Sequence, residues 1–331
     1  MMPEIPKPHN LEDEVFRITN EKQFRQIALE VFRRQYFHTA IYRSYCDALG
    51  QSPETVSAIE AIPFLPISFF KSHVVKNGDF DPVTVFQSSG TTGLTTSRHY
   101  IKDLSLYEKS FLDCFERFYG KPEKFCILGL LPSYLEQGSS SLVYMVDTLI
   151  KKSGHPQSGF YLYDHDKLQA TLSQLEESGQ PSILFGVTYA LLDFAATHAL
   201  PLKNTIVIET GGMKGRKKEL TKAELYQELK TAFSLSHVHA EYGMTELLSQ
   251  AYAIDGIYRS PAWMRIILRD ETDPFCLGGT SGAINVIDLA NLHSCSFIAT
   301  EDLGKLHADG SFEVLGRMDH TDIRGCSQLA L

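Results

Sequence analysis

A stretch of hydroxyl side chains and glycines occupies residues 88–95, which read Ser-Ser-Gly-Thr-Thr-Gly-Leu-Thr. Val85 and Phe86 precede it, so the pattern predicts a strand that runs into a loop. Glycine allows a backbone to approach a ligand closely, and successive N–H groups beside hydroxyls form a concave anion site. The stretch is therefore a candidate phosphate loop, although composition alone favours a polar surface turn. It is not a Walker A loop, because the Gly-Lys-Ser/Thr ending is missing.

A second candidate lies at residues 241–246, where a glycine is followed by a hydroxyl and a carboxylate. Gly243 permits a sharp turn after a predicted strand. Thr245 and Glu246 stand beyond that strand and suit a phosphate oxygen and a Mg²⁺ ion, which prefers oxygen ligands. The alternative is a strand end at which Thr245 caps the following helix.

Three further short motifs carry polar groups. Residues 209–212 read Glu-Thr-Gly-Gly, residues 300–304 read Thr-Glu-Asp-Leu-Gly, and residues 316–319 read Gly-Arg-Met-Asp. The carboxylate of Asp302 in the second of these can accept hydrogen bonds from two hydroxyl groups at once.

The hydroxyl loop and the later motifs, taken in order, resemble those of the adenylate-forming superfamily, which includes acyl-CoA synthetases and peptide-synthetase adenylation domains. The resemblance covers about residues 83–325 and implies that the chain binds ATP and Mg²⁺. It implies that Tyr242 flanks adenine, that Thr245 contacts the α-phosphate and that Glu246 holds Mg²⁺, the last two as catalytic residues. It also implies that Asp302 and Arg317 bind the ribose.

The nucleotide-binding residues implied by the resemblance come from all five motifs. They are Ser88, Ser89, Gly90, Thr91, Thr92, Gly93, Arg98, Gly211, Gly212, Tyr242, Gly243, Thr245, Asp302 and Arg317. The superfamily usually has a lysine shortly after its hydroxyl loop. This chain has Arg98 there, so Arg98 is expected to supply the cation.

The last residues resemble a narrower group. Residues 322–328 read Asp-Ile-Arg-Gly-Cys-Ser-Gln and are similar to the C-terminus of the acyl-protein synthetases of bacterial luminescence, the LuxE-like family. That resemblance implies that a fatty acid is activated as an acyl-adenylate, carried on the catalytic thiol of Cys326 and passed to a reductase partner. Without it, a spectator thiol at a frayed end is the simpler interpretation. Because the chain stops at Leu331, we also expect the superfamily's small C-terminal lysine domain to be absent.

Strand and helix patterns alternate between the motifs. Asn20 is the start signal and Gly50 the stop signal for a helix over residues 21–49, and Thr221 with Glu224 forms a capping box. Further helices are expected at 104–119, 141–152, 167–176, 189–198 (capped by Thr188) and 222–233, and strands at 83–86, 125–131, 161–163, 182–187, 205–209 and 237–241. The strands are almost continuously apolar, which is typical of a parallel sheet covered by helices on both faces. In such folds ligands bind at the carboxyl ends of strands, where three of the motifs fall.

The pattern changes after Trp263. Short strands at 264–268, 283–287, 294–300 and 312–314 alternate with turns, which predicts an antiparallel β subdomain. The expected fold is therefore α/β, an adenylate-forming large domain with parallel sheets flanked by helices and a C-terminal β subdomain. We expect an N-terminal helical segment at 1–75, a nucleotide-binding core at 76–255 and the β-rich part with the tail at 256–331, in one continuous domain.

Composition narrows the class of protein. The 331 residues are 43% hydrophobic and 21% charged, as in soluble globular proteins. A net charge of −9 argues against nucleic acid or an anionic membrane as partner. None of the six cysteines belongs to a Cys-x-x-Cys pair, so neither a zinc nor a thioredoxin-like site is indicated. We see no signal peptide or membrane span and expect a cytoplasmic location.

Three functions stay open on the sequence. The favoured one is an acid–thiol ligase that activates a carboxylic acid, expected to be a fatty acid, with ATP and passes the acyl group through Cys326 to a reductase or carrier protein. The second is a CoA ligase of the phenylacetate-CoA type, in which Cys326 is idle. The third is a non-catalytic nucleotide-binding subunit of an acyl-reductase complex.

Overall fold

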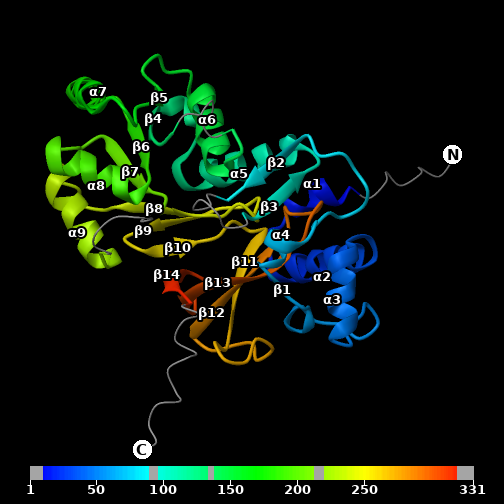
Figure 1. Ribbon diagram of the computed structural model, residues 1–331. Coiled ribbons are helices and arrows are strands. Elements are labelled where there is room, and N and C mark those ends of the chain that lie inside the picture. The colour runs from blue at the N-terminus through cyan, green and yellow to red at the C-terminus, as the bar shows by residue number, and fades with distance from the viewer. Residues whose placement is uncertain (1–9, 89–95, 133–137, 212–219, 319–331) are drawn as a thin grey trace, which may run out of the picture.

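The computed structural model describes residues 10–88, 96–132, 138–211 and 220–318, drawn in colour in Figure 1. Within these residues the helices are α1 (Leu11–Val15), α2 (Glu21–His38), α3 (Ala40–Ala48), α4 (Phe69–Ser72), α5 (Leu104–Tyr119), α6 (Ser141–Ser153), α7 (His165–Ser178), α8 (Thr188–Thr197) and α9 (Lys222–Phe233). Two 3₁₀ turns accompany them, η1 (Ile59–Ala61) and η2 (Pro122–Lys124).

One large sheet forms the frame of the molecule. Its strand order is β11-β12-β13-β14-β10-β9-β8-β7-β6-β4-β5, with β1 paired to β13. The strands are β1 (Leu65–Pro66), β4 (Cys126–Leu130), β5 (Gly159–Phe160), β6 (Ser182–Gly186), β7 (Thr205–Glu209), β8 (His239–Tyr242), β9 (Ala251–Ile254), β10 (Ile257–Arg259), β11 (Met264–Arg269), β12 (Ser281–Asp288), β13 (Phe297–Leu306) and β14 (Phe312–Arg317). A separate antiparallel pair consists of β2 (Thr84–Gln87) and β3 (Arg98–Ile101).

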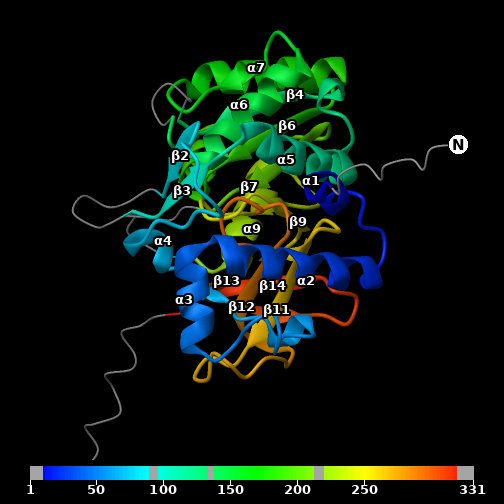
Figure 2. The same cartoon turned by 90° about the vertical axis from the view of Figure 1, so that its right-hand side faces the viewer.

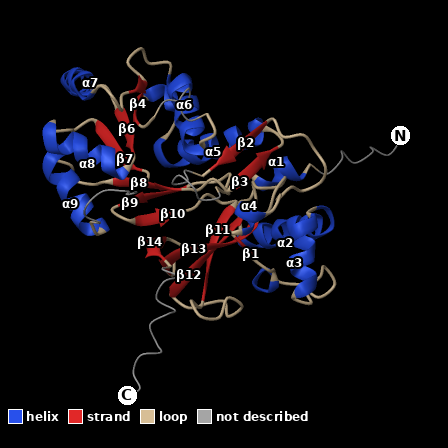
Figure 3. Ribbon diagram, in the orientation of Figure 1, coloured by secondary structure: helices blue, strands red, loops and turns tan. Residues whose placement is uncertain are grey.

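Strands β5, β4, β6, β7 and β8 run parallel and are covered on both faces, as predicted. Successive residues of a strand point to opposite faces. Accordingly, Ile183 of β6 belongs to the apolar cluster that includes α5 and α6, whereas its neighbour Leu184 belongs to the cluster of α7, α8 and α9. Figure 3 shows these helices on the two sides of the strands.

The strands after Trp263 are antiparallel, which confirms the prediction for this part of the chain. They continue the parallel strands through β9 and β10, so both kinds of pairing share one sheet. Helices α2 and α3 lie across β11–β13 (Figure 2), where the rings of Phe32 and Tyr42 pack against Phe297. The predicted strand at 294–300 begins later, at Phe297, because the N–H of Ser296 donates to the side chain of Gln35 in α2 instead of to a strand.

The hydroxyl motif joins the two strands of a hairpin. Gln87 lies opposite Arg98, and beyond them the N–H of Ser88 donates to the Ser97 carbonyl at 3.1 Å. The Ser97 N–H in turn donates to the Ser88 hydroxyl at 3.0 Å. The strand before the motif is therefore not a member of the parallel sheet, contrary to the expectation from strand and helix alternation.

Local capping signals mostly place the helix ends correctly. Asn20, Asp103 and Asp164 accept backbone N–H groups at the N-termini of α2, α5 and α7, and the capping box of Thr221 and Glu224 is formed. Each of these interactions joins residues at most three positions apart, so the sequence alone specifies it.

Three local predictions are wrong because distant contacts compete. The helix expected at 21–49 is two helices, broken at the buried Thr39, whose hydroxyl donates to the Ser294 carbonyl at 3.3 Å. Thr188 does not cap α8, since its hydroxyl donates to the Glu209 carboxylate. The strand expected at 161–163 is β5, two residues earlier, and Tyr161 only donates its N–H to Gly129 beyond it.

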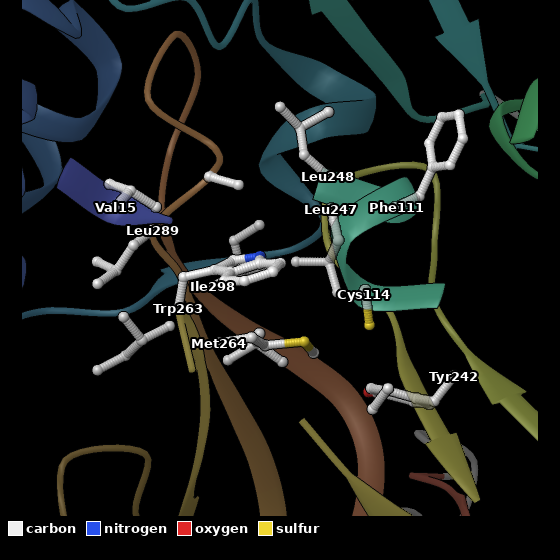
Figure 4. Packing of buried hydrophobic residues seen from close by; sticks show 14 of the residues in the cluster. Val15, Phe111, Cys114, Tyr242, Leu247, Leu248, Trp263, Met264, Leu289 and Ile298 are labelled. Carbon is white, nitrogen blue, oxygen red and sulfur yellow. The ribbon is translucent and has the colours of Figure 1, made fainter. Parts of the chain in front are cut away.

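The core beneath the second motif is organised by Trp263. Its buried indole N–H faces the hydroxyls of Ser110 at 3.2 Å and Ser249 at 3.0 Å. Figure 4 shows Trp263 among apolar side chains from distant segments, Val15, Leu247, Met264 and Ile298 among them. The segment that follows the motif is therefore fixed by packing with several other segments.

Candidate functional site

Several of the predicted residues meet around a cavity of about 560 Å³, which we call the motif cavity. Its walls include Ser88 of the hydroxyl motif, Gly243 and Thr245 of the second motif, and Thr210 of the turn after β7. Strands β7 and β8 are parallel neighbours, so the turns at their carboxyl ends lie at one edge of the sheet. The remaining wall is mixed, and its apolar side chains include Tyr107, Leu131, Leu142, Val143 and Met145.

A second group of predicted residues lies where β8 and β14 end, beside the middle of β13. The Tyr242 hydroxyl donates to Oδ2 of Asp302 at 2.8 Å, and Nε of Arg317 lies 3.5 Å from Oδ1 of the same carboxylate. Asp302 and Arg317 are direct partners in the β13–β14 register. The Arg317 side chain is 74% exposed, whereas that of Asp302 is 12% exposed. Burial raises the pKa of Asp302, an effect that Tyr242 and Arg317 oppose.

Glu246 is buried beside Ser97, the residue that pairs with Ser88. It is not among the residues that line the motif cavity. Burial raises its pKa, while the Ser97 hydroxyl and the charges of Lys71 and Arg317 lower it. A cation beside this carboxylate would offset its loss of water.

A magnesium ion fits this single carboxylate. Mg²⁺ is usually held by one or two carboxylates together with substrate phosphates and water. Within the described ranges no three His, Cys, Asp or Glu side chains form a cluster that would hold a metal by themselves. Glu246 therefore suits an ion that arrives with phosphate oxygens.

Glu241 also lines the motif cavity, although the sequence did not single it out. Burial raises the pKa of its carboxyl to about 8, and the negative charge of Glu209 adds to the rise. The carboxyl is therefore mostly protonated at neutral pH. A Cβ at position 243 would overlap Oε1 of Glu241, so a larger residue than Gly243 would displace this carboxyl group.

The turn after β7 is held by Glu209. Its Oε1 accepts the N–H of Gly211 at 2.6 Å and the hydroxyl of Thr188. Gly211 has φ of +78°, in the left-handed region that favours glycine. The glycine that the sequence singled out here is thus explained by backbone geometry.

Two residues that sequence reasoning missed hold the second motif in place. Nδ1 of the buried His99 lies 2.8 Å from the Thr245 carbonyl, and Nε2 lies 3.1 Å from Oδ1 of Asn291. Asn291 donates to the Glu246 carbonyl at 2.8 Å. Burial lowers the pKa of His99 to about 4. No local signal identifies this pair, since the partners of His99 are 146 and 192 residues away.

The other predicted residues are distributed as follows. Arg98 is exposed at the start of β3 and is not among the residues that line the motif cavity. The predicted residues Ser89, Gly90, Thr91, Thr92, Gly93, Gly212 and Cys326 lie outside the described residues.

The fold is that of the adenylate-forming enzymes. The structure of ATP-bound MatB from Rhodopseudomonas palustris matches with a TM-score of 0.52 and 17% identity, over 83% of this chain and 56% of that chain. An ATP-bound RpMatB-BxBclM chimera matches with a TM-score of 0.51 and 18% identity, over 70% of this chain and 47% of that chain. The expected fold class is thereby confirmed.

The family model described as acyl-protein synthetase, LuxE, matches residues 11–330. The chain belongs to this family, which confirms the narrower resemblance. A curated relative, the long-chain-fatty-acid–luciferin-component ligase of Photorhabdus luminescens, is 35% identical over 75 residues, or 22% of this chain. The chain matches 64% of the length of that relative, just under two thirds.

Crossing a membrane sets two requirements for a helix, which are length and apolar character. Throughout the described ranges, none of the helices combines the length and the apolar character that crossing a bilayer requires.

Proposed function

We propose that the chain activates a long-chain fatty acid with ATP and transfers the acyl group through the Cys326 thiol to a partner protein. The fatty carboxylate attacks the α-phosphorus of ATP, the bond to the leaving pyrophosphate breaks, and acyl-adenylate forms. The Cys326 thiolate then attacks the acyl carbonyl and AMP leaves. Family membership supports the acid–thiol chemistry, and the printed name of the Photorhabdus luminescens relative supports a long-chain fatty acid as substrate.

The observation that carries the proposal is that Tyr242, Asp302 and Arg317 form one cluster. The cluster adjoins the second motif, which lines the motif cavity. A buried carboxylate with its own arginine is neutralised as a pair and still has lone pairs for two ribose hydroxyls. Tyr242 links this cluster to the motif cavity, since Gly243 follows it directly.

The motif cavity is assigned to the acid. Its apolar side chains would pack the acyl chain, and the hydroxyls of Ser88 and Thr245 would lie near the reacting carboxylate and phosphate. Protonated Glu241 would avoid repelling a second carboxylate in the same space. Mg²⁺ supplies charge neutralisation on the phosphates when bound, and Glu246 is the residue that would hold it.

The test uses labelled tetradecanoate and ATP with the full chain. We expect acid-dependent pyrophosphate release and a protein-bound label that hydroxylamine removes. Cys326→Ser should keep the pyrophosphate release and lose the label, whereas Cys276→Ser, which removes an exposed thiol elsewhere, should keep both. A label that survives in Cys326→Ser, or wild-type protein without acid-dependent pyrophosphate release, contradicts the proposal. Acyl-CoA formed by Cys326→Ser when CoA is added would identify CoA as the acceptor.

Glu246→Gln separates the magnesium role from nucleotide binding. We expect pyrophosphate release to fall while the Kd for AMP stays near that of wild type, because AMP lacks the phosphates that a bound ion would bridge. Equal pyrophosphate release by the variant and wild type would remove Glu246 from the proposal.

A further inference from the structure

A second cavity, which we call the Arg269 cavity, has a volume of about 710 Å³. It lies between α3, η1 and β1 on one side and β11 and β13 on the other, a region seen in Figure 2. Apolar side chains form much of its wall, including Leu49, Ile62, Phe64, Ile67 and Leu277. The volume is within the range of small-molecule pockets, about 300–1,000 Å³.

This cavity and the proposed ribose site lie on opposite faces of β13. Ala299 and Glu301 line the Arg269 cavity, and successive strand residues alternate between faces. Asp302 therefore points away from it, toward Tyr242. The Arg269 cavity also shares no lining residue with the motif cavity.

The cavity contains a buried cation, the guanidinium of Arg269. Arg269 is 7% exposed, and its Nη1 donates to the Ile284 carbonyl at 2.9 Å and to Oδ1 of Asn285 at 2.6 Å. Its Nη2 donates to the Thr300 carbonyl at 2.5 Å and faces the weakly accepting sulfur of Met318 at 3.9 Å. Across the described ranges, no carboxylate oxygen lies within ion-pair distance of Arg269. A buried charge that lacks a counter-charge is costly.

A second buried donor lies on the same face. Nδ2 of Asn285 has no hydrogen-bond partner among the described residues, although the side chain is fully buried. Asn285 pairs directly with Ala299 of the cavity wall and with Ile267, which precedes Arg269 by two positions. Directly opposed residues and residues two apart share one face of a sheet. Arg269 and Asn285 therefore lie on the face that the cavity occupies, where Arg269 lines the cavity and Asn285 lies behind it.

We propose that the Arg269 cavity binds a long-chain fatty acid, with its carboxylate at Arg269 and its chain along the apolar wall. A guanidinium suits the two oxygens of one carboxylate, and its positive charge balances the charge of that carboxylate. The wall also contains two acidic residues, Glu60 and Glu301. Glu60 is paired with Arg25 at 2.8 Å. The site goes beyond the proposed function, because it holds an acid away from the motif cavity.

Calorimetric titration of the full chain with dodecanoate, without nucleotide, tests the site. Wild type should bind two molecules per chain, one in each cavity. Arg269→Met should weaken one of these sites by about tenfold to a hundredfold, the range for hydrogen bonds to charged groups. Phe275→Asp should do the same, since Phe275 lines the cavity, is 63% exposed and would bring a negative charge to its rim.

Two matched controls accompany these variants. Arg265→Met removes the same charge from the same strand where it pairs with Glu21, and Phe37→Asp makes the same change at another exposed phenylalanine. Both should bind dodecanoate like wild type. Dodecanol, which lacks the carboxylate, should bind wild type and Arg269→Met equally.

Three results would overturn the proposal. They are a single wild-type site that Arg269→Met leaves unchanged, unchanged binding in Phe275→Asp, and equal losses of dodecanol and dodecanoate in Arg269→Met. If Arg269→Met does not fold, Phe275→Asp decides the matter, because its side chain is at the surface. A failure of the proposed adenylation would leave this result untouched, since the titration contains no ATP.

Discussion

Strand β13 separates two sites with opposite charge arrangements. On one face Asp302 is a buried carboxylate, accompanied by the exposed Arg317 and the hydroxyl of Tyr242. On the other face Arg269 is a buried guanidinium that reaches the Thr300 carbonyl and has no carboxylate partner in the described part of the chain. The first arrangement suits neutral hydroxyl groups, whereas the second suits an anion. In these proposals the two faces of β13 receive ligands of different charge, because a carboxylate is buried on one face and a guanidinium of β11 on the other.

The largest expected effect is on folding and distinguishes the two arginines. Arg269→Met should lower the free energy of unfolding by about 2–4 kcal/mol, because it leaves buried carbonyls without donors. Arg317→Met should change it by less than about 0.5 kcal/mol, since that side chain is largely exposed. Urea unfolding of both variants measures the difference. Similar losses in the two variants would show that the arrangements are not energetically distinct.

The next effect concerns nucleotide affinity. Asp302→Ala should weaken AMP binding by about 1.5–3 kcal/mol, or roughly tenfold to over a hundredfold in Kd. Glu301→Ala, one residue along on the other face of β13, should leave the Kd unchanged. Both can be followed by calorimetry, and the ligand-free melting temperature of Asp302→Ala should stay within a few degrees of wild type. Equal AMP affinity in wild type and Asp302→Ala would refute the ribose assignment.

A third effect is a pH dependence that originates in the motif cavity. The pKa of Glu241 is raised in the folded state to about 8, so folding takes up a proton between the unfolded pKa and that value. Wild-type stability should therefore fall as pH rises from about 4.5 to 8, at up to about 1.4 kcal/mol per pH unit for one such group. Glu241→Gln should remove this slope and be more stable than wild type at pH 8.5 by about 1–3 kcal/mol.

Urea unfolding at pH 5 and pH 8.5 checks this prediction. Glu228→Gln, which changes an exposed glutamate on α9, is the control and should keep the wild-type slope. A Glu241→Gln protein with the same pH slope as wild type would mean that Glu241 ionises like an exposed carboxyl.

The smallest effect has the opposite sign and belongs to the Arg269 cavity. Arg25 lowers the pKa of Glu60, so the contribution of this pair is present above the unfolded pKa and is lost as pH falls through the folded value. The pair is about half exposed, and Glu60→Gln should cost at most about 1 kcal/mol at pH 7. The loss should disappear at pH 3, which urea unfolding at the two pH values can test. A larger loss at pH 3 than at pH 7 would contradict the assignment.

Sequence motifs pointed to the residues of the proposed nucleotide site, but no sequence motif pointed to the Arg269 cavity. Tyr242, Asp302 and Arg317 belong to short motifs with recognisable spacing, and the structure places them together. His99 and Asn291 have no such context, and their role follows from contacts with the second motif across the fold. Asn285 lies in an apolar strand pattern that predicts only a buried strand.

The sequence by itself determined the features that depend on near neighbours. Helix starts at Asn20, Asp103 and Thr221 are set by side chains within three residues, and the apolar strands predict a sheet covered on both faces. Such interactions form whatever the rest of the chain does.

The tertiary structure alone decided the features that depend on burial and on distant partners. These are the break at Thr39, the hairpin that carries the hydroxyl motif, the raised pKa of Glu241 and the burial of Arg269 with no carboxylate partner among the described residues. The free energy of a charge depends on the water and the counter-charges around it, and those are set by other segments that the fold brings together. A glutamate and an arginine in the sequence therefore do not reveal which of them will be neutralised, paired or left facing a cavity.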